Sequence, residues 1–192
     1  MTRRAPTGAR RAATRRASVG LTLVAGALVL LSGCGGLFTA QSDPGPALPT
    51  PQASYSAGIA ATVGTLTAAL GAAGIPLSPP ASPARPSEPA SLLQTPRAVL
   101  QAGIGDPSGG YVVVYQLPDG PAATAAATEL AVYLGSGFGQ TNFPVDTQFH
   151  VAAEGDTVIL AWWSRERATD DALAEAAFDA VAGVGLEVPV IK

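Results

Sequence analysis

Two adjacent tryptophans, Trp162 and Trp163, lie in the segment 157–164 (TVILAWWS), which is apolar at almost every position. Neighbouring side chains of a strand point to opposite faces of the sheet, so a strand that buries both rings is covered on both sides. In the segment 110–117 (GYVVVYQL), apolar residues also occupy consecutive positions, so they would lie on both faces of a strand. We therefore expect these two strands at the centre of a sheet that carries a packed layer on each face.

The other periodic segments give a strand–strand–helix order that occurs twice. Strands are predicted at 96–104 and 147–153, and the second hairpin turns at 154–156. Helices are predicted at 119–137 and 170–183, since capping residues begin them and glycines end them. The sequence thus predicts an α+β domain with a four-stranded antiparallel sheet, built from two ββα units with both helices on one face.

A further helix is predicted near residues 54–74, ahead of this domain. Its apolar residues recur at helical spacing: Tyr55, Ile59, Val63, Leu66 and Leu70. The opposite face has only small and uncharged residues, so the helix depends on a packing partner. We expect it to cover the other face of the sheet; a helix that serves another protein, and disorder, remain as alternatives.

Charge is distributed unevenly along the chain. Six of the eleven basic residues lie in the first 16 positions, whereas all fourteen acids lie at or after Asp43. The formal net charge is −3 for the whole chain and −9 for the residues after Cys34. A product this acidic argues against nucleic acid as a partner, and against electrostatic attachment to anionic lipid, because both need a basic patch.

The first 35 residues have the three-part pattern of a secretory signal. Residues 1–16 are basic and polar, residues 17–31 are apolar or small, and Leu31-Ser32-Gly33-Cys34 follows. The apolar run is shorter than the roughly 20 residues of a membrane-spanning helix. Cys34 is the only cysteine, so no disulfide partner exists within the chain.

Leu31-Ser32-Gly33-Cys34 resembles the lipobox of bacterial lipoproteins. The resemblance implies that a diacylglycerol is attached to the thiol of Cys34, that the chain is cut before Cys34, and that palmitate-type acyl chains anchor it. The expected location is the outer side of the bacterial cell membrane. A plain signal peptide with an incidental cysteine, or an uncleaved anchor, is the alternative; Sec and twin-arginine export both stay open.

Composition divides the chain into five segments. Two stretches rich in glycine or proline separate the predicted helix from its neighbours. The predicted organisation is a signal peptide at 1–33, a flexible tether at 34–51, an amphipathic helix at 52–75, a Pro-rich linker at 76–91 and an α+β domain at 92–192. The last segment resembles uncharacterised bacterial lipoproteins in TPRAV, GYVVVY and GDTVIL, which implies no activity.

No catalytic, cofactor-binding or metal-ligating residue is predicted. His150, the only histidine, lies in QFHVAA with Phe149 and Val151 on the opposite face, and we expect it to face solvent. We predict an exported lipoprotein with a small binding or interaction domain, more consistent with a non-enzyme, whose ligand or protein partner is unknown. The rivals are an envelope enzyme using His150, Asp146 and Glu154, and a purely structural envelope module.

Overall fold

The computed structural model describes residues 54–80, 84, 86–106 and 109–192. The chain divides into two units, and all described residues belong to the second, Pro49–Lys192. The predicted signal peptide and Cys34 lie outside the described residues.

The described residues form six strands, four α-helices and two 3-10 helices. In chain order these are α1 (Ala57–Ala72), β1 (Leu77–Ser78), the 3-10 helix η1 (Ala90–Leu92), β2 (Arg97–Ala102), β3 (Tyr111–Gln116), α2 (Gly120–Gly135), α3 (Gly137–Gln140), β4 (Thr147–Glu154), β5 (Thr157–Ser164), the 3-10 helix η2 (Arg165–Arg167), α4 (Asp171–Ala182) and β6 (Leu186–Glu187). The four longer strands and both longer helices of the predicted ββα units are present.

The sheet is antiparallel throughout, with strand order β1-β2-β3-β5-β4-β6. The α+β class and the antiparallel sheet are confirmed, but the predicted four strands are six. The additional strands, β1 and β6, have two residues each and pair with the outer long strands β2 and β4. A two-residue strand has no period, so sequence patterning does not reveal it.

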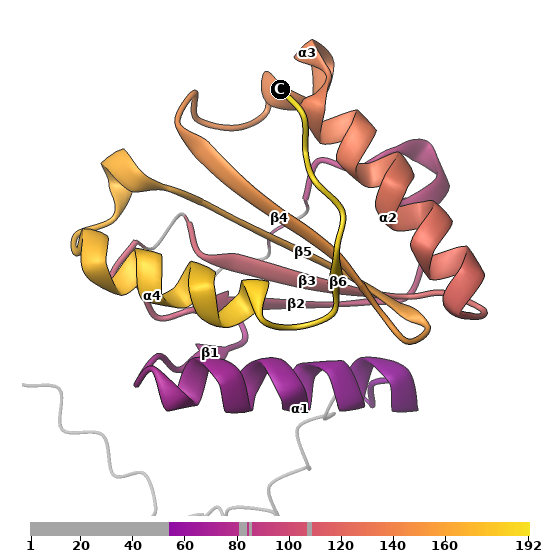
Figure 1. The fold of residues 1–192 in the computed structure, drawn as a ribbon, viewed down its shortest axis with the longest axis horizontal. Helices are drawn as coiled ribbons and strands as arrows, with labels where there is room; N and C mark the ends of the chain where they lie inside the picture. Colours follow the sequence, from indigo (N-terminus) through magenta and orange to yellow (C-terminus); the bar gives the residue numbers. More distant parts are fainter. Residues whose placement is uncertain (1–53, 81–83, 85, 107–108) are drawn as a thin grey trace, which may run out of the picture. The chain divides into compact units, whose positions relative to one another are not determined.

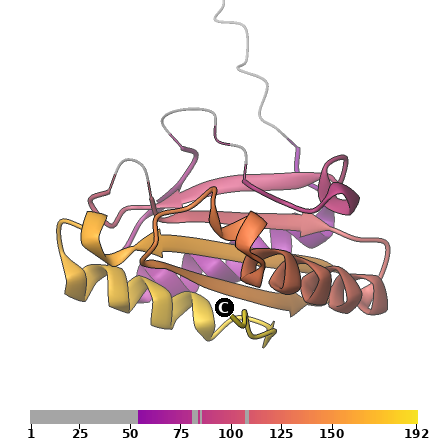
Figure 2. The same ribbon diagram turned by 90° about the horizontal axis from the view of Figure 1, so that it is seen from above.

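The two central strands are covered on both faces, as the apolar runs predict. Every residue of β5 is buried, and β5 lies between β3 and β4 (Figure 2). Trp162 and Trp163 are 9% and 3% exposed and belong to separate hydrophobic clusters on opposite faces. The alternation of side chains along a strand therefore places one ring in each core.

The helices divide between the faces differently from the prediction. α2 packs on one face, where Leu130 and Leu134 meet Val158 and Leu160, whereas α1 and α4 share the other face (Figure 1). The prediction that α2 and α4 lie on one face, with α1 alone on the other, was wrong. α2 contacts β4 and β5 on its way from β3 to β4, so α4, which also contacts β4, packs on the opposite face.

α1 is part of the core and not a separate helix. Of the five apolar residues predicted to share one face of this helix, Ile59, Leu66 and Leu70 are in the core and Val63 packs against it. Tyr55 is exposed. The Ser56 side chain caps the helix by accepting from the Ile59 N–H. Thr62, also buried, shares a hydrogen bond of 2.8 Å with Thr157 of β5.

α2 and α4 begin and end close to the predicted residues. Asp119 and Asp170 cap them by accepting from the backbone N–H of the third helical residue, and Pro121 lies in the first turn of α2. In α4 the fully buried residues are Ala174, Ala177 and Val181. Leu173, Ala176 and Ala180 are partly buried against the same core.

Candidate functional site

The three residues of the rival enzyme hypothesis are not brought together. Asp146 precedes β4, His150 is in its middle, and Glu154 ends it. At about 3.3 Å per residue, an eight-residue separation along an extended strand spans roughly 26 Å. Asp146 and Glu154 therefore lie at opposite ends of the strand, and no shared site forms from these three side chains.

His150 does not face solvent, as the sequence led us to expect. It is 1% exposed and lies on the face covered by α4, with its ring 6.1 Å from that of Phe178 between centroids. Burial lowers the pKa of His150 below its ordinary value of 6.5; the Glu187 carboxylate, 3.9 Å from Nδ1, opposes this shift only in part. The prediction failed because it left β4 with one uncovered face, which α4 in fact covers.

Asp146 and Glu154 each take part in hydrogen bonds that hold neighbouring parts of the chain together. Both Asp146 carboxylate oxygens accept from Ser164 Oγ, at 2.7 and 2.8 Å, and one also accepts from the Glu166 N–H at 2.9 Å. The Glu166 N–H and the Ser164 hydroxyl hold the pKa of Asp146 below its ordinary value of 3.8. Glu154 begins the β4–β5 hairpin, in which Gly155 has a φ of 57° and the Glu154 carbonyl accepts from Thr157 Oγ.

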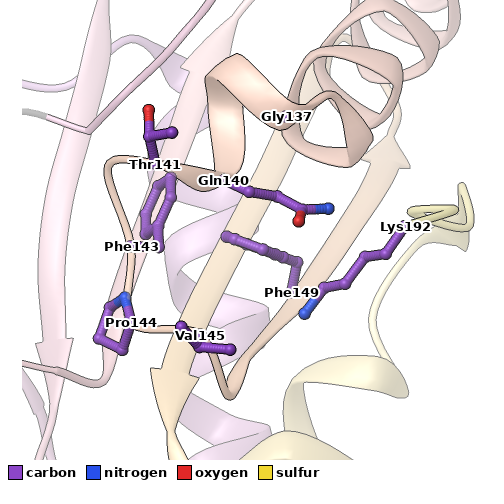
Figure 3. A pocket seen from close by; sticks show the side chains of 8 residues that line it. All are labelled: Gly137, Gln140, Thr141, Phe143, Pro144, Val145, Phe149 and Lys192. Atoms are coloured by element: carbon purple, nitrogen blue, oxygen red, sulfur yellow. The ribbon is translucent and has the colours of Figure 1, made fainter.

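Two adjoining hollows lie on the α2 face of the sheet, beside α3. The first has a volume of about 430 Å³ and is lined by the eight residues labelled in Figure 3. The second has a volume of about 490 Å³ and is lined by Ala84, Pro86, Ser87, Tyr111, Asn142, Phe143, Pro144, Trp162 and Arg167. Because Phe143 and Pro144 line both hollows, we treat the two as one surface and call it the aromatic cleft.

A row of aromatic rings forms the floor of the aromatic cleft. Tyr111, Trp162 and Phe149 occupy paired positions on three neighbouring strands, since Trp162 is opposite Tyr111 on β3 and opposite Phe149 on β4. The rings of Tyr111 and Trp162 stack with centroids 5.1 Å apart. Phe143, from the loop after α3, contacts Trp162 and Phe149 edge-on at 5.6 and 4.8 Å. Antiparallel pairing therefore lines up the rings, and the loop completes the row.

The end of α2 and the C-terminal segment shape the first hollow. Ser136 ends α2 and caps α3 by accepting from the Gly139 N–H, which turns the chain above β4. A side chain at Gly135 would collide with the Ile191 carbonyl, so glycine there lets the C-terminal segment pass close to α2. The Lys192 ammonium group donates to the Thr147 carbonyl and lies 5.2 Å from the Phe149 ring centre (Figure 3).

Polar contacts that are buried or partly buried fasten the segment that lines the second hollow. Ser87 shares a hydrogen bond of 2.9 Å with the Tyr133 hydroxyl of α2. The next residue, Glu88, accepts from Arg97 of β2 and, at 2.7 Å, from the Tyr115 hydroxyl of β3. These contacts hold Pro86 and Ser87 against the sheet beside the aromatic row.

Sequence reasoning missed the aromatic cleft. No residue of the cleft was singled out as a candidate site residue. The signal that could have revealed the row is the set of aromatic residues at 111, 149 and 162, but only the strand register puts them side by side. Phe143 joins them through a loop whose course no periodicity specifies.

No protein-family model, curated protein or solved structure matches this chain. Within residues 54–80, 84, 86–106 and 109–192, no helix is long and apolar enough to cross a membrane. The same residues contain no group of three or more histidine, cysteine or acidic side chains placed to hold a metal ion.

Proposed function

We propose that this protein is an exported bacterial lipoprotein, held at the outer side of the cell membrane by lipid on Cys34, whose domain binds a ligand in the aromatic cleft. The anchor rests on the lipobox-like Leu31-Ser32-Gly33-Cys34 that follows a basic and an apolar segment. Two or more acyl chains give stable attachment, whereas one is marginal. The acidic domain itself then needs no affinity for the bilayer.

The aromatic row is the observation that carries the binding role. Concave surfaces with an apolar floor and a few polar groups are the usual form of a small-molecule site, and each hollow has the volume of one. Val145, which lines the first hollow, and Phe138, next to the lining residue Gly137, are 102% and 73% exposed and add apolar surface. Exposed apolar patches of this kind mark binding surfaces.

The first described residues contact the end of β3 that is remote from the aromatic cleft. Ser56, just before α1, donates to Gln116 at the last position of β3, whereas Tyr111 in the aromatic row is at the first position. Five strand residues separate these ends by roughly 17 Å. The described chain therefore begins at the end of β3 that is opposite to the aromatic row.

The proposed lipid anchor is tested by identifying the N-terminal residue of the mature protein and the lipid attached to it. Protein purified from bacterial envelopes should begin at Cys34 and carry a diacylglyceryl group by mass spectrometry, and it should incorporate labelled palmitate. Cys34→Ser should abolish the labelling, whereas Gly33→Ala, which keeps a small residue at the cut, should retain it. An unlipidated wild-type chain would refute the anchor.

The cleft is tested with fluorine NMR on the full chain labelled with 5-fluorotryptophan. The two tryptophans make this experiment self-controlled, because Trp162 lines the cleft and Trp163 lies in the opposite core. Naphthalene-2-carboxamide, a neutral flat ligand, should shift the Trp162 resonance and leave Trp163 in place. Phe143→Ala should weaken the binding, and Leu186→Ala, an exposed apolar control on β6, should not. If Trp162 does not respond, the domain has no binding function at this cleft and the structural-module hypothesis gains.

A further inference from the structure

The basic side chains that line the aromatic cleft have no carboxylate partner within the described part of the chain. Four basic residues are described, and two of them, Arg97 and Arg165, form ion pairs with glutamates. Arg167 and Lys192 form none with any described residue, and each lines one of the two hollows. In a chain with a charge of −9 after Cys34, carboxylates outnumber cations, so two unpaired cations at one cleft indicate a site for an external anion.

Arg167 has the larger capacity to bind such an anion. Its guanidinium group is exposed and has five N–H donors, none of which forms a hydrogen bond with a described residue. The Lys192 ammonium group has three donors and already gives one to the Thr147 carbonyl. A guanidinium also matches a carboxylate or a similar planar anion with two parallel hydrogen bonds.

The described side chains that line the cleft add no competing negative charge. None of them is acidic in either hollow. Asp146, next to Val145 in the first hollow, has its carboxylate occupied by the Ser164 hydroxyl and the Glu166 N–H. Glu166 is exposed and is the neighbour of Arg167, but it does not line the second hollow. An anion at Arg167 therefore meets a cation and an apolar floor.

The aromatic floor specifies the rest of the ligand. The Tyr111–Trp162 stack and the Phe143 ring offer flat apolar surface within the same hollow as Arg167. Ring stacking favours a planar ligand body, and about 490 Å³ fits a small molecule and not a folded partner.

From these observations, and resting on the binding function proposed above, we infer that the aromatic cleft is a site for a small organic acid with a flat apolar body. The body lies against Trp162 and Phe143, and the anionic group binds Arg167. Lys192 provides a second, weaker positive charge at the far end of the cleft.

Three ligands that share one ring system test this inference. Naphthalene-2-carboxylate, naphthalene-2-carboxamide and 2-naphthylmethylammonium are negative, neutral and positive at pH 7, and each is titrated into the full fluorine-labelled chain in nonionic detergent at physiological ionic strength. The carboxylate should bind about fivefold more tightly than the amide, the ratio given by a solvent-exposed ion pair at the upper end of its usual range. The ammonium ligand should bind most weakly.

Variants then locate the anion. Arg167→Gln should reduce the affinity for the carboxylate to that for the amide while leaving the amide unchanged, and Lys192→Gln should have a smaller effect. Arg165→Gln is the matched control, because Arg165 is an exposed neighbour in η2 that pairs with Glu175 and lies outside the cleft. A carboxylate preference that survives Arg167→Gln would overturn the assignment.

The outcomes separate this inference from the proposed function. Equal binding of all three ligands at Trp162 would overturn the anion specificity and leave a binding cleft. Tightest binding of the ammonium ligand would overturn it also. Absence of any Trp162 shift with the three ligands would remove both the cleft and its specificity.

Discussion

His150 is enclosed by the core that α4 forms on the sheet. Neither ring nitrogen has a hydrogen-bond partner among the described residues. Burial disfavours the charged imidazolium, and although the Glu187 carboxylate and the Val184 backbone favour it, the net effect is a lowered pKa. The residue therefore contributes to the pH dependence of folding and is remote from the aromatic row, which lies on the other face of the sheet.

The domain should lose stability as the pH falls below about 6.5. The folded-state pKa of His150 lies below its ordinary value of 6.5, so the unfolded chain binds the extra proton first and acid favours unfolding. Urea unfolding of the full chain at pH 7.5 and pH 5.0 measures this loss. His150→Phe, which removes the titrating ring, should flatten the profile between these pH values; an unchanged profile in the variant would mean that another group is responsible.

Tyr115 supplies a second buried polar contact with a measurable effect. Its hydroxyl, in a side chain that is 0% exposed, donates to the Glu88 carboxylate, and burial raises its pKa. Tyr115→Phe should lower the free energy of unfolding by about 1.5–3 kcal/mol, since the hydrogen bond is made to a charged group. Tyr133→Phe, which loses only the partly buried bond to Ser87, should cost less in the same denaturation experiment. Equal costs would show that the Glu88 contact is not the stronger one.

At the scale of the element, α1 shows how a helix of weak intrinsic propensity is held in place. It has no charged residue and contains Gly58, Gly64 and Gly71, each of which disfavours a helix relative to alanine. Burial of Leu66 and Leu70 and the bond from Thr62 to Thr157 offset this cost. Tertiary packing, and not local propensity, therefore accounts for its stability.

Two glycine substitutions in α1 should have different effects. A Cβ at Gly64 would meet nothing within 4 Å, so Gly64→Ala should raise the free energy of unfolding by about 0.5–1 kcal/mol. A Cβ at Gly58 would lie 2.5 Å from Asp156 Oδ1 and from Gln116 Oε1, so those side chains must move and Gly58→Ala should gain less. Thermal unfolding of both variants checks the order; a larger gain at Gly58 would contradict it.

At the scale of the whole domain, one sheet supports two cores. Trp162 lies in the core under α2, and Trp163 lies in the core under α1 and α4. β3 and β5 contribute side chains to both cores. If these strands unfold, both cores therefore lose packing contacts. The described residues should therefore unfold in one cooperative transition.

The mutation Leu66→Ala tests this coupling. Leu66 is 0% exposed in the α1 core, so its truncation should cost about 3 kcal/mol. In urea titrations of the fluorine-labelled chain, the native resonances of Trp162 and Trp163 should disappear at the same denaturant concentration, and the variant should lower both midpoints equally. A midpoint that falls for Trp163 alone would divide the domain into two folding units.

The elements of this domain follow from local sequence. Apolar runs bounded by turn residues predict β2, β3, β4 and β5, and capping residues at the starts of the predicted helices 119–137 and 170–183 indicate where α2 and α4 begin. The opposed rings of Trp162 and Trp163 predict a sheet covered on both faces. Each of these features depends on residues a few positions apart, for which strand and helix geometry leave few options.

Only the tertiary structure decided which face each helix covers, and with it the candidate site. α4 packs opposite α2 because α2 already covers β4 and β5, and this placement buries His150. The aromatic cleft joins Tyr111, Phe149 and Trp162 through strand register, and adds Phe143 and Lys192 through a loop and the C-terminal segment. Contacts between residues so far apart depend on how the layers pack, which no local periodicity encodes.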